Sequence, residues 1–178
     1  MKEIQQLREL VEFLAKENKV IRHSDDECHF ACTLDDADVK YATVMHYPCV
    51  VFDCGDIMFN GGPETKLNRS VSLFFVDHVS DTGDESEKLA MYEQMEETAL
   101  AFVAQIIALS KRYEGVPFLN RIDVDNTRMM KIEHEEQSLC GWALTFSLSQ
   151  ILRECYAESQ FDKADIIDKF GLQFLYKK

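Results

Sequence analysis

Cys28, His29 and Cys32 are the densest group of potential metal ligands in this sequence. Thiolate and imidazole groups are ligands that zinc prefers, and a structural zinc site needs four of them. The sequence offers no second pair of such residues at a matching spacing. We therefore interpret residues 28–32 as an ordinary strand or loop segment, and we predict no metal and no cofactor for this chain.

The histidines His46, His78 and His134 are candidates for a general base, because imidazole changes its charge near physiological pH. Each lies near the end of an expected strand, but none has a serine or cysteine beside it in a recognisable nucleophile pattern. The sequence thus predicts a protein that is not an enzyme. A small metal-dependent hydrolase that uses His29, His46 or His78 remains an alternative.

Two further patterns match ligand-binding loops only in part. Asp123, Asp125 and Asn126 alternate oxygen-bearing side chains as the start of a calcium loop does, but the loop glycine and the later glutamate are absent. We interpret this segment as a turn. Gly61 and Gly62 precede a proline instead of a helix with Lys-Ser or Lys-Thr, so they predict no phosphate-binding loop.

The composition is typical of a folded protein with an acidic surface. The chain has 178 residues, of which 46% are hydrophobic, and its formal net charge is -13. We expect one domain over residues 1–178, with its core in 3–149 and a C-terminal extension in 150–178. The negative charge repels phosphate groups, which argues against sequence-independent nucleic-acid binding and against an anionic membrane surface.

The cysteines and the N-terminal residues indicate the redox state of the compartment in which the protein is expected. We find no apolar run long enough to span a membrane, and residues 1–7 lack the apolar segment of a signal peptide. Cys49, Cys54 and Cys140 lie in apolar strand contexts, where a thiol packs as a small hydrophobic group. We therefore expect a reducing compartment.

The longest amphipathic pattern runs from Asp84 to Arg112 and predicts one long helix. Asp84 can accept hydrogen bonds from the first-turn amides, and Glu87 can complete a capping box. The outer face is acidic and predicts a solvated surface or contact with a basic partner: Glu93, Glu96 and Glu97. Apolar side chains recur every three or four residues on the inner face: Leu89, Tyr92, Met95, Ala99, Phe102, Ile106 and Leu109.

The remaining elements complete an α+β fold. Residues 3–18 predict an N-terminal helix, residues 23–40 an irregular acidic segment, and residues 162–170 a C-terminal tail helix. Turn residues at Gly55-Asp56 and at 60–63 predict an antiparallel hairpin. Strands are expected at Cys49–Asp53, Ser70–Asp77, Arg121–Asp125, Met129–His134 and Leu139–Ser149. The resulting fold has two layers, a mainly antiparallel sheet covered by one long helix.

The order of elements over residues 3–149 resembles that of bacteriophage tail-completion, or tail-terminator, proteins of the head–tail junction. Phe74-Phe75-Val76-Asp77, followed by a polar loop and a long helix, is similar to the middle of that family. Gly141-Trp-Ala-Leu-Thr-Phe-Ser-Leu148 is similar to its last strand. The long acidic segment 19–47 and the extension 150–178 depart from the family pattern, which leaves open a related neck or ring protein.

The resemblance implies a structural virion protein of the tail or neck. It implies a homo-oligomeric ring, commonly a hexamer, that ends the tail tube, contacts neck or connector proteins, and lets DNA pass through its lumen without specific binding. Such a protein is located in the virion, and in the host cytoplasm during assembly. We expect subunit contacts at the sheet edge, at segment 55–66 and at the apolar C-terminus. An acidic protein-binding module of the immunity or adaptor type is the alternative.

Overall fold

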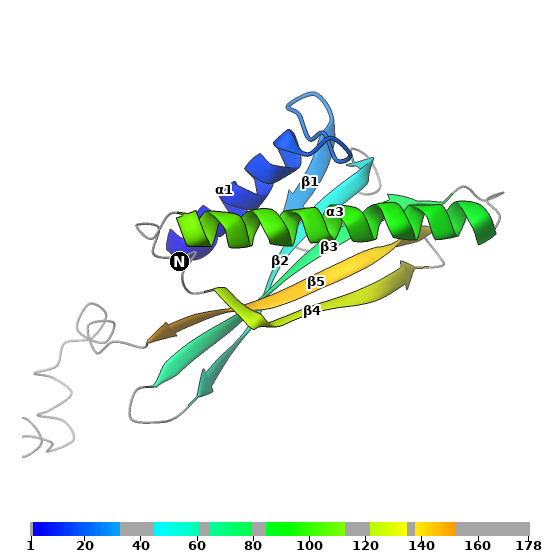
Figure 1. The fold of residues 1–178 in the computed structure, drawn as a ribbon. Helices are drawn as coiled ribbons and strands as arrows, with labels where there is room; N and C mark the ends of the chain where they lie inside the picture. The colour runs from blue at the N-terminus through cyan, green and yellow to red at the C-terminus, as the bar shows by residue number, and fades with distance from the viewer. Residues whose placement is uncertain are drawn as a thin grey trace, which may run out of the picture.

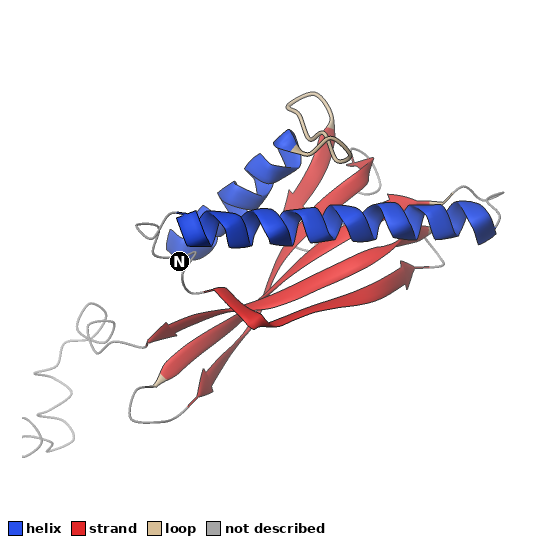
Figure 2. Cartoon of the chain, in the orientation of Figure 1, coloured by secondary structure: helices blue, strands red, loops and turns tan. Residues whose placement is uncertain are grey.

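The computed structural model describes residues 2–32, 45–60, 65–79, 85–112, 122–134 and 138–151 of the chain. These ranges contain two helices and five strands, shown in Figure 1 and Figure 2. The elements, in chain order, are α1 (Lys2–Glu17), β1 (Cys28–Cys32), β2 (Met45–Asn60), β3 (Lys66–His78), α3 (Glu85–Arg112), β4 (Ile122–His134) and β5 (Leu139–Ile151).

The strands form one sheet in the order β1-β2-β3-β5-β4. β1 pairs with β2 in parallel, and the three other neighbouring pairs are antiparallel. Runs of β-branched and aromatic side chains, such as Cys49–Phe52 and Val71–Val76, favour strands of this kind. Four of the strands are 13 to 16 residues long, and the sheet curls into a half-barrel. The right-handed twist of each long strand, added up across the sheet, accounts for that curl.

Both helices lie on one face of the sheet. α1 contacts β1 and β2, whereas α3 contacts β5 and β3 (Figure 1). The core lies between the helices and this face. Its largest fully buried side chains are Phe75, Leu7, Ile21, Leu73, Met95 and Leu144, and the rings of Phe75 and Phe102 meet edge to face with centroids 5.0 Å apart.

The expected fold of a sheet covered by one long helix, with a further helix at each end, is wrong. Strands make up 51% of the described residues, and two helices share the cover of the curled sheet. The physical reason is the width and curvature of the sheet, because a single rod can follow only part of a curled surface. The expected tail helix at 162–170 lies outside the described residues.

The apolar faces predicted for the two observed helices are largely confirmed. In α1, Leu7, Val11 and Leu14 are buried, and Ile4 and Leu10 pack against the core. In α3 the inner face matches from Tyr92 to Leu109. Leu89 is the exception, since 58% of its surface is exposed. The helix begins at Glu85 in the structure, and the proposed cap Asp84 lies outside the described residues.

Three expectations about strand boundaries were wrong. Gly55 and Asp56 do not form a turn but lie inside β2, where the register shifts between Cys54 and Ile57. Residues 122–134 form one strand, not two, with a register shift between Asp123 and Arg128. The segment expected to be irregular contains β1. A β-bulge takes up an extra residue without ending the strand, so turn-favouring residues did not mark an end here.

None of the helices in the described ranges is long and apolar enough to cross a membrane.

Candidate interaction surfaces

The residues singled out as possible zinc ligands lie on β1 but do not converge. Cys28 Sγ donates to the carbonyl of Phe30 at 3.3 Å, and His29 Nδ1 lies 2.8 Å from the carbonyl oxygen of Pro48. Cys32 packs against the core below the helices. Within the described ranges, no three His, Cys, Asp or Glu side chains are grouped so that they could hold a metal ion. Residues 28–32 form a strand, one of the two structures, strand or loop, that were expected for this segment.

The candidate general bases are scattered. His46 is exposed, and its ring centroid lies 5.5 Å from that of the buried His29. His78 is exposed at the end of β3, with its ring 5.9 Å from the ring of Tyr47. The side chain of His134 lies outside the described residues. The ring contacts described for His46 and His78 are thus with His29 on β1 and with Tyr47 on β2, respectively.

His23, which the sequence analysis did not single out, contacts two elements through its two ring nitrogens. The main-chain N–H of His29 donates to His23 Nδ1 at 3.2 Å, and His23 Nε2 lies 3.9 Å from Glu12. Burial lowers the pKa of His23, and the positive charge of Lys16 lowers it further. A neutral ring keeps Nδ1 as an acceptor. His23 therefore joins α1 to the start of β1.

The possible calcium ligands and the glycine pair form no site in the described structure. Asn126 Nδ2 donates to Asp123 Oδ2 at 2.6 Å, beside the register shift of β4. The side chain of Asp125 lies outside the described residues, as do Gly61 and Gly62. Asp123 Oδ2 thus accepts a hydrogen bond within the register shift of β4.

The outer end of the β2–β3 hairpin extends past the helix layer (Figure 1). We call residues 55–60 of β2 and 66–69 of β3 the hairpin arm. All six arm residues of β2 are exposed. They include three large hydrophobic side chains: Ile57 at 39%, Met58 at 63% and Phe59 at 63% exposure. Ile57 and Phe59 are two residues apart on the strand and so share one face of the arm, and exposed apolar side chains side by side are typical of an interaction site.

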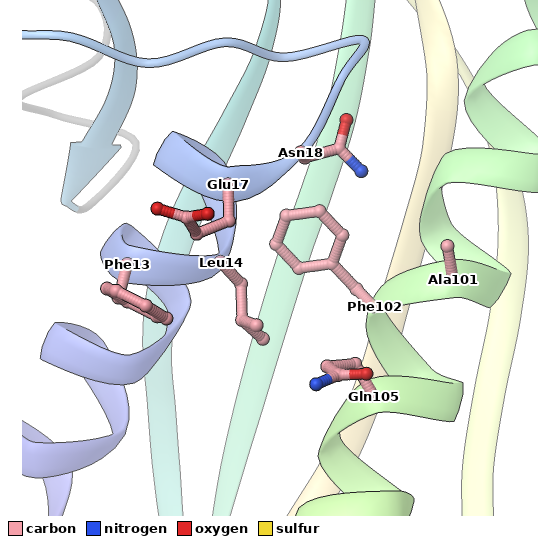
Figure 3. A pocket seen from close by; sticks show the side chains of 7 residues that line it. All are labelled: Phe13, Leu14, Glu17, Asn18, Ala101, Phe102 and Gln105. Atoms are coloured by element: carbon pink, nitrogen blue, oxygen red, sulfur yellow. The ribbon is translucent and has the colours of Figure 1, made fainter.

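A second apolar surface lies in the helix layer, as a groove between the end of α1 and the middle of α3. The groove has a volume of about 370 Å³. Leu14 and Phe102 point toward each other at its centre (Figure 3). Its full lining is Phe13, Leu14, Glu17, Asn18, Ala101, Phe102 and Gln105. Phe13 is 57% exposed, and Leu100, next to Ala101 on α3, is 51% exposed.

The edge of β4 and the outer face of α3 are two other surfaces that a partner protein could contact. The outer edge of β4 is interrupted by its register shift and carries exposed charged side chains, namely Arg128, Lys131 and Glu133. Bulges and edge charges hinder pairing with a further strand. On α3, the predicted acidic outer face is confirmed as exposed, with Glu93, Glu96 and Glu97 in water. The hairpin arm and the groove are therefore the better candidates for an apolar contact.

No protein-family model matches this chain, and no curated protein matches its sequence.

Proposed function

We propose that this chain is a structural subunit that assembles with copies of itself into a closed ring. We further propose that the ring belongs to the tail or neck of a bacteriophage, where it ends the tail tube and joins it to the connector. The observation that carries the first part is the pair of separate apolar surfaces, the hairpin arm and the groove between α1 and α3. The second part follows the order of elements along the sequence.

Two different surfaces on one chain favour a head-to-tail contact over a two-fold one. A two-fold dimer uses the same patch on both copies, whereas a head-to-tail contact joins one patch to a different patch. Repetition of a head-to-tail contact gives a ring when the rotation closes. The arm projects from the sheet and the groove is concave, so one chain carries both shapes that such a contact needs.

The charge of the chain fits a ring around passing DNA. The net charge is -13, and part of it lies in a row of exposed glutamates on the outer face of α3. Acidic side chains on a lumen wall would repel the phosphate backbone, so DNA could move without being held. Low-salt binding to duplex DNA tests this part, and tight binding would contradict it.

A second candidate is an acidic module that masks a basic partner protein. The exposed Glu93, Glu96 and Glu97 on α3 support it, because complementary charge steers such partners together. This candidate predicts a monomer in the absence of the partner.

Light scattering on the purified full chain separates the two candidates. The ring predicts a mass that is a fixed multiple of the 20.6 kDa chain over a range of concentrations, with ring-shaped particles in electron micrographs. A mass of 20.6 kDa at every concentration would overturn the ring and favour the module.

A further inference from the structure

The two faces of the hairpin arm differ in character. Residues directly opposite each other on paired strands share a face, and Ile57 lies opposite Arg69 while Phe59 lies opposite Leu67. Val71, two residues after Arg69, belongs to the core below the helices. Alternation along β3 therefore places Ile57 and Phe59 on the continuation of the core face, beyond the point where the helices cover it. This face of the arm carries Ile57, Phe59 and Leu67 beside Arg69, and neither of the described helices covers it.

The reverse face of the arm is mainly polar. Met58 lies there opposite Asn68, and Asn60 lies opposite Lys66. Met58 and Phe59 are equally exposed, at 63% each, and are neighbours in sequence. They differ in the face that they occupy, which makes them a matched pair for experiments.

Charge favours contact between the arm and the groove. Residues 55–69 carry no net charge, because Asp56 and Glu64 balance Lys66 and Arg69, although the chain as a whole has a net charge of -13. Such acidic copies repel each other, so a joint between them needs a local attraction. Arg69 lies on the same arm face as Ile57, and the groove has an acidic group, Glu17, at its edge.

We propose that the face of the arm with Ile57 and Phe59 docks in the groove between α1 and α3 of a second copy of this chain. Phe59 would pack on the exposed Phe13 and Ala101 of that copy, above the buried floor of the groove. Arg69 would lie near its Glu17. This inference rests on the proposed self-assembly and names the joint that produces it. Each copy gives its arm to one neighbour and receives an arm from the other.

The first test compares Phe59→Glu with Met58→Glu in the full chain. Both variants add one negative charge at positions of equal exposure, but only the first places it in the joint. Phe59→Glu raises the concentration needed for assembly by at least about tenfold, as expected for a central aromatic contact. Met58→Glu raises it much less. Sedimentation velocity over a dilution series measures both, and circular dichroism checks that both variants fold. Equal effects of the two changes would overturn the proposed joint.

The second test mixes two variants that lack opposite halves of the joint. The Phe59→Glu variant keeps an intact groove, and the Phe13→Glu variant keeps an intact arm. Phe13 is 57% exposed, so we expect the fold to tolerate its replacement. Each variant alone is a monomer. An equimolar mixture forms a dimer with one copy of each, and nothing larger, because only one intact joint is available. A mixture that stays monomeric would overturn the proposed joint.

The two proposals fail in different ways. If the unaltered chain is a monomer at every concentration, the proposed self-assembly itself is wrong. If the unaltered chain forms rings and Phe59→Glu forms them equally well, the self-assembly stands and the arm-in-groove joint is wrong. Equal ring formation by Phe59→Glu is also expected if residues 152–178 of the same chain, and not a second copy, occupy the arm.

Discussion

The indole Nε1 of Trp142 on β5 donates a hydrogen bond of 2.9 Å to the main-chain carbonyl of Tyr92 on α3. The hydroxyl of Tyr92 in turn donates to the carbonyl of Ile132 on β4 at 3.2 Å and approaches Glu133 at 3.3 Å. Lys131 Nζ lies 3.6 Å from the centre of the Tyr92 ring. Burial raises the pKa of Tyr92 to about 12, so its hydroxyl remains a donor. These contacts fix α3 on β5 and on the edge strand β4.

We predict that Tyr92→Phe lowers the free energy of unfolding by about 1 kcal/mol, the usual net value of one buried hydrogen bond. The change removes only the hydroxyl and leaves the ring below Lys131. Trp142 is the single tryptophan of the chain, so its fluorescence during urea unfolding reports on this region. An unchanged urea midpoint would show that the hydroxyl contributes nothing.

Gly141 is a position where β5 and β3 approach closely. A Cβ atom added there would lie 1.9 Å from the carbonyl oxygen of Phe75, whereas one added at Gly55 would lie 3.6 Å from Ser70 Cβ. We predict that Gly141→Ala costs about 3 kcal/mol of stability, because the backbone of β3 must move. Gly55→Ala, the matched control, costs less than about 1 kcal/mol. Thermal unfolding compares them, and similar losses would contradict this account.

We predict a loss of stability at acid pH that depends on His23. Burial lowers its pKa in the folded protein, so the unfolded chain binds a proton more readily. Stability is therefore complete above the ordinary value of 6.5 and falls as the pH drops through 6.5 to the folded-state value. Urea unfolding about one unit above and about one unit below that pH measures the loss. His23→Asn keeps an acceptor for the His29 N–H and reduces the loss, whereas the exposed His78→Asn does not. Equal losses in the two variants would rule out His23 as the source.

Thiol reactivity gives a test of the burial pattern. Cys140 is 1% exposed, and its pKa is raised by burial and by the nearby Asp77. Since the thiolate is the reactive form, we predict that Cys140 reacts with iodoacetamide more slowly than the half-buried Cys28, by at least about tenfold. Peptide mass spectrometry at several reaction times measures this ratio. Reaction of Cys140 as fast as Cys28 would show that α3 does not cover β5 as described.

The elements with strong local patterns were predictable. The alternation of Trp142, Leu144, Phe146 and Leu148 identified the inner face of β5, and the three- and four-residue spacing identified both observed helices. These patterns depend on neighbouring residues and on one buried face, which the sequence shows directly.

Features that depend on distant residues were missed. β1 lies among acidic residues and is held by parallel pairing with β2, where Phe30 lies opposite Val50. The polar residues that flank β1 in the sequence give no indication of this pairing with β2. The register shift near Gly55 was missed for a related reason, because pairing with β3 continues past it. The number of helices on the sheet likewise follows from the curvature of the sheet, which no single segment encodes.

The interaction surfaces were predicted only in outline. Segment 55–66 was expected to make subunit contacts, yet it was expected as a loop, whereas residues 55–60 extend a strand. The groove between α1 and α3 was not anticipated at all, since Leu14 and Phe102 come together only in the fold (Figure 3). The contacts themselves stay predictions.

Native mass spectrometry of the purified full chain tests the assembly most directly. If copies join head to tail and the rotation closes, one dominant species has a mass equal to a fixed integer, greater than two, times 20.6 kDa. A spectrum with only the 20.6 kDa chain, or one that ends at a two-fold dimer, would contradict the ring.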